Sequence, residues 1–265
     1  YRRNRSNLIV GLDIDLTKIP PHLQSEKKPL VAFASEVIEA TADDVIAYKP
    51  NSAFFEAYGP AGLEQLQEII ALIPSTIPVI LDAKRGDIGN TAKMYARAAF
   101  EQFQADAVTL APYMGTDSLI PFCEYKDKYQ FVLVLTSNPS AKEIEMVELR
   151  SKEPLYLQTA RMVRKLSDAY GNCGAVVGAT QPEHAGAVTD LLPDSLFLIP
   201  GIGTQGGSVE EILTAVSAKQ RKNCLFNVSR DILYGSSQKD FATVAKSKAR
   251  EYKEEINRVL STLTN

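Results

Sequence analysis

The stretch Val79-Ile80-Leu81-Asp82-Ala83-Lys84 decides the fold class, because it is a short apolar run that ends in charged side chains. Runs of this kind recur at fairly even intervals, and none alternates apolar with polar residues. Continuous apolar runs of this length are typical of strands buried on both faces of a parallel sheet. The predicted strands are Leu8–Leu12, Val45–Lys49, Val79–Ala83, Ala107–Leu110, Phe131–Leu135, Cys173–Val177, Leu196–Ile199 and Cys224–Val228.

Segments with helical periodicity separate these runs. The clearest are Gly62–Ile73, Thr91–Phe103, Leu155–Ala169 and Phe241–Leu263, and weaker ones are Leu30–Thr41, Asp117–Cys123, Glu183–Leu191 and Ser208–Ala218. We predict N-terminal caps at Thr91, Asp117 and Ser208. Alternating strands and helices fit an open doubly wound sheet or a closed barrel. Eight repeats of about 33 residues favour the second, a (β/α)8 TIM barrel forming a single domain over residues 1–265.

The composition is that of a globular protein and excludes several function classes. Hydrophobic residues make up 45% and charged residues 23% of the 265 residues, and the formal net charge is −3. Nucleic acids and anionic membranes require a basic excess, so neither is an expected partner. No apolar stretch approaches the roughly 20 residues of a membrane span.

The three cysteines are widely and irregularly spaced, which predicts buried, reduced thiols and a reducing, cytoplasmic location. The first residue is Tyr rather than Met. We therefore expect that the chain has been trimmed or cut from a longer one.

Charged side chains gather at the carboxyl ends of the predicted strands, where barrels carry their active sites. Asp13 follows the first strand, Lys49 ends the second, Asp82 and Lys84 end the third, and Asp87 lies just beyond. Because side chains alternate along a strand, Asp82 and Lys84 are expected to face the same way. Mutual attraction holds such groups charged, and a lysine held in this way can deliver a proton. The plainer alternative is an ion pair that merely ends the strand.

The stretch Pro200–Gly207 follows the seventh strand and matches G-x-G-x-x-G. No acidic residue ends the next strand, so a dinucleotide site is not indicated. Glycines let backbone N–H groups approach an anion, and barrels often bind phosphate with the loops after strands 7 and 8. Arg230, at the end of the eighth strand, supplies a forked cation. We interpret this region as a phosphate site, with a plain glycine-rich turn as the alternative.

Two further features complete the predicted rim. Thr136–Pro154 is long and polar, which indicates a lid or a binding loop. Asp13, Asp82 and Asp87 are carboxylates that could hold Mg²⁺, but the lysines among them argue against a metal. We therefore predict no metal site.

The stretch Leu81–Ile88 resembles the D-x-K-x-x-D-I motif of orotidine 5′-phosphate decarboxylases, in the longer form of that family. The resemblance covers nearly the whole chain. The other matching segments are Val10–Asp13, Tyr48–Asn51, Thr136–Pro139, Pro200–Gly207 and Val228–Arg230. It implies a cofactor-free and metal-free conversion of orotidine 5′-monophosphate (OMP) to UMP and CO₂, the last step of de novo UMP biosynthesis.

The resemblance also implies roles for individual residues. Lys84 would protonate C6 after CO₂ leaves, Asp82 would face the substrate carboxylate, and Lys49 would fix the charge array. Asp87 and Thr91 would come from the neighbouring subunit of a homodimer. The residues implied in substrate binding are Asp13, Thr91, Ser137, Pro200, Gln205, Ser229 and Arg230. Ser137 would contact the pyrimidine and Asp13 the ribose. Some members of the family are fused to orotate phosphoribosyltransferase, so a fusion partner is possible here.

Three other functions fit part of the pattern. A Mg²⁺-dependent sugar-phosphate decarboxylase or hexulose-phosphate synthase of the same barrel group would carry an acidic metal ligand in place of Lys49. A Schiff-base aldolase would use Lys84 as its nucleophile. A non-catalytic nucleotide-binding barrel would not need two lysines interleaved with carboxylates.

Overall fold

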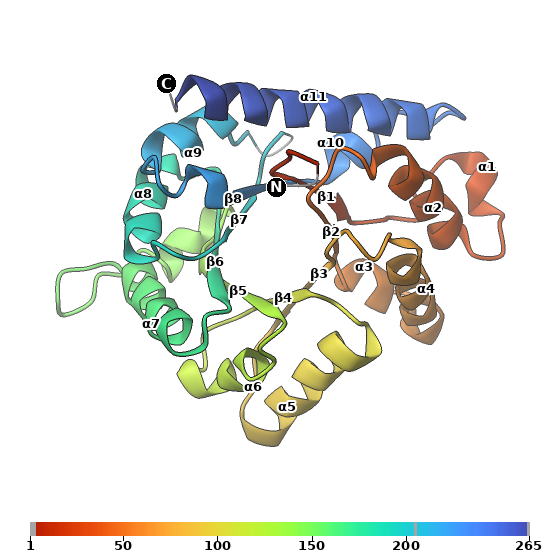
Figure 1. Ribbon diagram of the computed structural model, residues 1–265. Coiled ribbons are helices and arrows are strands. Elements are labelled where there is room, and N and C mark those ends of the chain that lie inside the picture. Colours follow the sequence, from red (N-terminus) through yellow and green to blue (C-terminus); the bar gives the residue numbers. More distant parts are fainter. Residues whose placement is uncertain (1–3, 204–205, 264–265) are drawn as a thin grey trace.

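Within residues 4–203 and 206–263, which the computed structural model describes, eight parallel strands curl into a barrel (Figure 1). They are β1 (Leu8–Leu12), β2 (Ala47–Pro50), β3 (Ile80–Arg85), β4 (Ala107–Leu110), β5 (Tyr129–Leu135), β6 (Cys173–Val177), β7 (Phe197–Pro200) and β8 (Cys224–Val228). Their order in the sheet is β2-β1-β8-β7-β6-β5-β4-β3. Isolated parallel bridges, Tyr48 with Val79 and Asn51 with Asp82, join β2 to β3. The predicted (β/α)8 barrel is confirmed.

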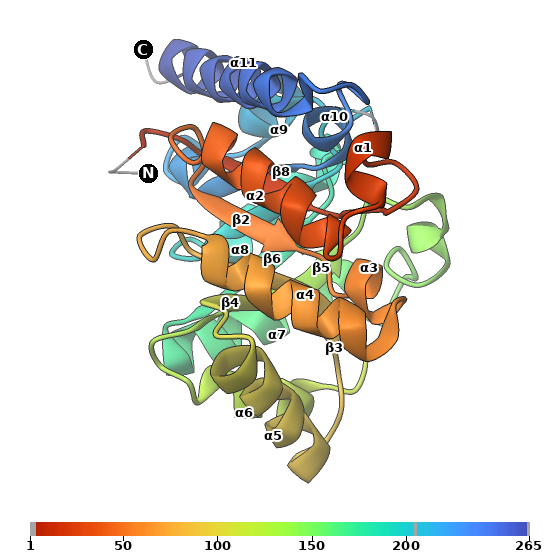
Figure 2. The same cartoon turned by 90° about the vertical axis from the view of Figure 1, so that its right-hand side faces the viewer.

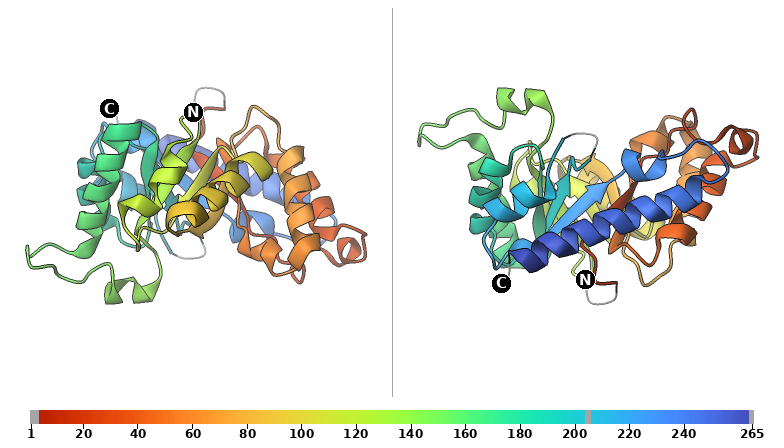
Figure 3. Two further views of the ribbon diagram at one scale, coloured as in Figure 1. Left: turned by 90° about the horizontal axis from the view of Figure 1, so that it is seen from below. Right: turned by 90° about the horizontal axis from the view of Figure 1, so that it is seen from above.

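Helices surround the strands on the outside (Figures 1 and 2). The α-helices are α1 (Pro21–Gln24), α2 (Pro29–Thr41), α3 (Ala53–Glu56), α4 (Gly59–Leu72), α5 (Gly89–Arg97), α6 (Ile120–Cys123), α7 (Leu155–Tyr170), α8 (Pro182–Leu191), α9 (Val209–Ala215), α10 (Arg230–Leu233) and α11 (Phe241–Thr262). Short 3-10 turns cover Thr116–Ser118, Pro139–Glu143 and Arg221–Asn223, and a π-helical turn, Ala98–Gln102, extends α5. The long α11 runs along the outside beside α2, α9 and α10 (Figure 3).

Apolar side chains pack on both faces of the sheet. The inner face carries one buried apolar residue from each strand: Ile9, Ala47, Ile80, Ala107, Phe131, Val176, Leu198 and Leu225. A larger cluster fills the space between strands and helices. Burial on both faces explains why the strands read as uninterrupted apolar runs. Because side chains fill the barrel interior, a binding site has to lie above this layer, at the strand ends.

One of the three predicted helix caps is confirmed and two are wrong. Ser208 caps α9, and its hydroxyl accepts a hydrogen bond from Glu211 N. Thr91 lies inside the first turn of α5, because that helix already begins at Gly89. Asp117 lies in a 3-10 turn, and α6 begins after it, where Pro121 suits the first turn of a helix.

Two other expectations concern the cysteines and membrane spans. Cys123, Cys173 and Cys224 are free and buried, as predicted. Among the described residues, no helix is both long and apolar enough to cross a bilayer.

Candidate active site

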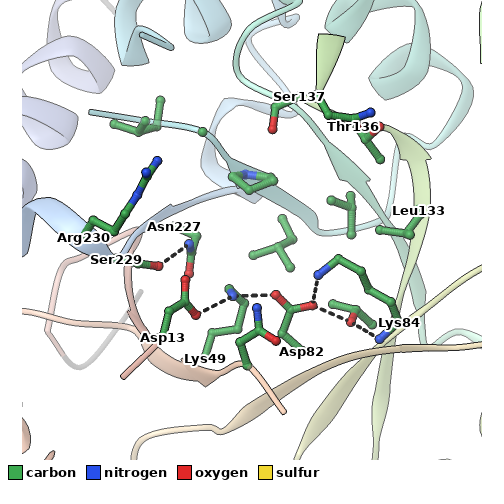
Figure 4. A pocket seen from close by; sticks show the side chains of 18 residues that line it. Asp13, Lys49, Asp82, Lys84, Leu133, Thr136, Ser137, Asn227, Ser229 and Arg230 are labelled. Carbon is green, nitrogen blue, oxygen red and sulfur yellow. Dashed lines mark hydrogen bonds and ion pairs between the residues drawn. The ribbon is translucent and has the colours of Figure 1, made fainter. Parts of the chain in front are cut away.

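A pocket of about 410 Å³ opens at the carboxyl ends of the strands, above the inner apolar layer (Figure 4). Eight of the predicted site residues line it: Asp13, Lys49, Asp82, Lys84, Ser137, Pro200, Ser229 and Arg230. They come from strands that are far apart in the chain, and they meet because all eight strands run in the same direction.

A row of alternating charges lies along one side of the pocket (Figure 4). Lys49 Nζ lies 2.7 Å from Asp82 Oδ2 and 3.8 Å from Asp13 Oδ1. Lys84 Nζ lies 2.6 Å from Asp82 Oδ1, which also accepts a hydrogen bond from Thr109 Oγ1 at 2.9 Å. Lys49 and Asp82 are 4% and 7% exposed, whereas the Lys84 side chain is half exposed. Lys84 is therefore the member of the row that is open to a bound molecule.

Burial and neighbouring charges shift the pKa values of Asp82 and Lys49 in opposite directions. Burial alone would raise the pKa of Asp82, but the ammonium groups of Lys49 and Lys84 outweigh it and hold that pKa far below its usual range. Burial alone would lower the pKa of Lys49, but the carboxylates of Asp82 and Asp13 outweigh it and raise that pKa. The buried pair therefore stays ionised at neutral pH.

The backbone of Lys84 adopts a left-handed conformation with φ of +47°, which is uncommon for a residue other than glycine. The register between β3 and β4 shifts between Leu81 and Arg85. The hydroxyl of Thr109 holds the irregularity, since it accepts a hydrogen bond from Lys84 N at 3.0 Å. Asp82 and Lys84 do meet as predicted, but through this irregular backbone and not through simple alternation along a strand.

The opposite wall is formed by the ends of β7 and β8. Gly201 and Gly203 have φ of +100° and +79°, conformations that favour glycine. Ser229 and the exposed Arg230 line the pocket beside them. The predicted Gln205 lies outside the described residues.

Comparison with known proteins identifies the family. The model described as "Orotidine 5'-phosphate decarboxylase / HUMPS family" matches residues 6–245. The chain belongs to this family. The orotidine 5'-phosphate decarboxylase of Herpetosiphon aurantiacus is 48% identical over 249 residues, which cover 94% of this chain and 92% of that protein. Both the resemblance to this family and the assignment to a decarboxylase are confirmed.

Solved structures agree with this assignment to the decarboxylase family. The Leishmania donovani OMP decarboxylase has a TM-score of 0.84 and 39% identity, covering 98% of this chain and 96% of that one. The Leishmania donovani UMP synthase has a TM-score of 0.86 and 39% identity, covering 98% of this chain. This chain spans 55% of the length of that synthase.

Two of the predicted site residues of this decarboxylase-family chain do not line its own pocket. Asp87 lies beyond the end of β3, and Thr91 is exposed on α5. Neither is among the residues around the pocket. Asp87 is partly buried and Thr91 exposed, both after the end of β3.

Several pocket residues were given no role in the sequence analysis, among them Asn51, Thr109, Leu133, Val176 and Leu198. Asn138 and Asn227 are polar residues at strand ends and also line the pocket. Asn227 is 7% exposed, and its Oδ1 receives no hydrogen bond from the described residues. Asn51 directly follows β2, so the rule that found Lys49 could have found it as well.

The side chains of the pocket can also be compared with those that a metal ion would require. Among the described residues, no group of three or more His, Cys, Asp or Glu side chains is arranged to hold a metal ion. Both oxygens of Asp82 already contact Lys49, Lys84 or Thr109.

Proposed function

We propose that this protein converts OMP to UMP and CO₂ by direct decarboxylation, the last step of de novo UMP biosynthesis. The row Asp13–Lys49–Asp82–Lys84 along one side of the pocket carries this proposal. It presents a half-exposed ammonium group beside a buried carboxylate, and it belongs to a chain 48% identical to a protein named for this reaction.

The row suggests how the bond is broken. Asp82 faces the carboxylate of the bound substrate, so the two negative charges repel when the substrate lies in the pocket. The C6–carboxylate bond breaks, CO₂ leaves, and the electron pair remains on C6. Lys84 stabilises that carbanion electrostatically and then transfers its proton to C6, and it regains a proton from solvent.

The remaining walls suit the rest of the nucleotide. Leu133, Val176 and Leu198 give an apolar surface for the pyrimidine, with Ser137 at its edge. Asp13 and Lys49 hold the ribose hydroxyls. The phosphate is bound by Pro200, Gln205, Ser229 and Arg230, the last of which supplies a forked cation. Binding energy gained at this distant phosphate contributes to catalysis at C6.

The reaction we propose needs neither metal nor cofactor. Two ammonium groups stand where a cation would be needed, and they engage both oxygens of Asp82. The Mg²⁺-dependent sugar-phosphate enzymes considered above would need an acidic ligand at Lys49.

We also propose a homodimer in which Asp87 and Thr91 complete the partner's pocket. Both lie outside their own pocket, on the surface that carries β3, α5 and the turn after β4. That surface is rich in exposed large apolar side chains, as expected of an interface. They are Ile88, Met94, Tyr95, Tyr113 and Met114.

The decarboxylase domain in this proposal spans residues 1–265. This chain matches 55% of the length of a UMP synthase. That match supports the possibility that the barrel is fused to orotate phosphoribosyltransferase in a longer protein. The buried, free thiols suit a cytoplasmic location.

The test follows the ultraviolet absorbance of OMP with purified protein and excess EDTA. We expect rapid loss of the orotate absorbance and formation of UMP, with Lys84→Ala as the inactive control. Activity that appears only with added Mg²⁺ would favour the sugar-phosphate alternative. Trapping of a substrate adduct by borohydride would favour the aldolase. Binding of UMP without turnover of OMP would favour a non-catalytic barrel.

A further inference from the structure

Glu145 makes two hydrogen bonds to the end of β5, beside the pocket. It lies in the segment between β5 and α7, which projects from the barrel next to α7 (Figure 1). Its Oε2 accepts a hydrogen bond from Thr136 N at 2.8 Å, and its Oε1 accepts one from Thr136 Oγ1 at 2.6 Å. One carboxylate thus holds both the backbone and the side chain of the residue that precedes Ser137.

The backbone of Glu145 is itself anchored. Its carbonyl oxygen accepts a hydrogen bond from Tyr156 N at 2.9 Å, in the first turn of α7. Two residues further along, the carbonyl of Val147 accepts one from Leu155 N at 2.9 Å. Glu145 therefore connects the end of β5 to the start of α7 across the base of the projecting segment.

The next two carbonyl groups of this stretch are held from the loop after β6. Gln181 Nε2 donates to Thr136 O at 2.8 Å, and Thr180 Oγ1 donates to Ser137 O at 3.2 Å. Gly178 allows this close approach, since a Cβ there would lie 2.8 Å from Ser137 N. Thr136 is consequently held by Glu145 and Gln181, and Ser137 by Thr180, before any ligand arrives.

We propose that Glu145 is a positioning residue for pyrimidine recognition. It does not touch the substrate, but it orients Ser137, which lines the pocket at the place we assign to the base. This inference rests on the proposed function. A pre-ordered contact does not have to be immobilised when the ligand binds, so it binds more tightly than a flexible one. Hydrogen bonds to a charged group typically change an equilibrium constant by about 10- to 100-fold.

The role predicts a selective defect. Glu145→Ala should raise KM for OMP and the inhibition constant of UMP by about 10-fold or more. It should leave inhibition by ribose 5-phosphate unchanged, because that compound has the ribose and phosphate but no base. Glu145→Gln keeps one acceptor for Thr136 N and should show a smaller defect. Glu143, exposed in the same segment, gives the matched control Glu143→Ala, which should change neither constant.

The outcomes separate this role from a purely structural one. Equal weakening of UMP and ribose 5-phosphate would overturn the proposal, because general loosening of the barrel mouth affects both ligands. Unchanged UMP binding in Glu145→Ala would also overturn it. If Glu145→Ala does not fold, Glu145→Gln and Gln181→Ala carry the same comparison of ligands. Absence of OMP turnover in the unaltered protein would refute the proposed function, while a selective loss of UMP binding would still support the role of Glu145.

Discussion

The ammonium nitrogen of Lys49 lies 2.7 Å from Oδ2 of Asp82, and both residues are more than nine-tenths buried. The other oxygen of Asp82 contacts Lys84 at 2.6 Å. The carboxylate is therefore the centre of the row, and its removal would bring two ammonium groups together without a counter-charge between them. This arrangement makes Asp82 a structural as well as a chemical element of the site.

Replacing Asp82 should destabilise the fold. We expect Asp82→Asn to lower the free energy of unfolding by about 3 kcal/mol, because it leaves Lys49 buried with its nearest remaining carboxylate, Asp13, 3.8 Å away. Urea denaturation provides the measurement. Asp127→Asn, at an exposed turn, is the matched control and should stay within about 0.5 kcal/mol of the unaltered protein. Equal stability of the two variants would contradict the expected role of the pair.

The pH dependence of that difference follows from the two pKa shifts. The lowered pKa of Asp82 contributes stability above the ordinary Asp pKa of about 3.9, and the contribution is lost as the pH falls below it. The raised pKa of Lys49 contributes stability below the ordinary Lys pKa of about 10.4, and the contribution is lost as the pH rises through the folded-state value. The difference in unfolding free energy between the unaltered protein and Asp82→Asn should be constant from about pH 5 to 9 and smaller near pH 3. A decrease between pH 7 and pH 5 would show that the pair is not ionised as we describe.

The left-handed backbone of Lys84 allows its effect on activity to be measured separately from its effect on stability. Lys84→Ala should lower kcat by about 1000-fold or more, because the group that we propose as proton donor is lost. Lys84→Gly should be equally inactive but more stable than Lys84→Ala by about 1 kcal/mol, since glycine adopts φ of +47° without strain. Activity assays and urea denaturation of both variants test this. Substantial activity in either variant would exclude Lys84 as the donor, and equal stability would exclude strain at this position.

The barrel and much of the pocket could be predicted from the sequence because they depend on simple physical regularities. Strands buried on both faces have continuous apolar runs, as in Cys173–Val177. All strands of a parallel barrel end at one rim, so charged residues at strand ends meet. That rule predicts Asp13, Lys49 and Arg230 in one pocket, and all three line it.

Other features depend on contacts that no local pattern reveals. The left-handed conformation of Lys84 arises where the register of β3 shifts against β4 and Thr109 binds its backbone. Glu145 lies in a segment without helical or strand periodicity. Its hydrogen bond with Thr136 can be found only in the folded structure.

Loss of the forked cation at the end of β8 should weaken substrate binding. We expect Arg230→Ala to raise KM for OMP by about 10- to 100-fold, because the charged hydrogen bonds that we propose between Arg230 and the phosphate would be lost. Gln205→Ala should also raise KM for OMP. Steady-state kinetics provide the measurement, with the exposed Arg258 of α11 supplying the control Arg258→Ala. Unchanged KM in both Arg230→Ala and Gln205→Ala would refute the phosphate assignment.

The site that we propose to be shared between subunits gives the most decisive test of the dimer. Lys84→Ala and Asp87→Ala proteins should each be inactive alone, because every pocket then lacks a required group. In a mixed dimer, one pocket has both changes, whereas the other combines an intact Lys84 with the partner subunit's intact Asp87. Random pairing of equal amounts should therefore restore roughly a quarter of the activity of the unaltered protein. If Asp87 served its own pocket, no mixed dimer would contain an intact site, and the activity of the co-refolded mixture would stay at the level of the two separate variants.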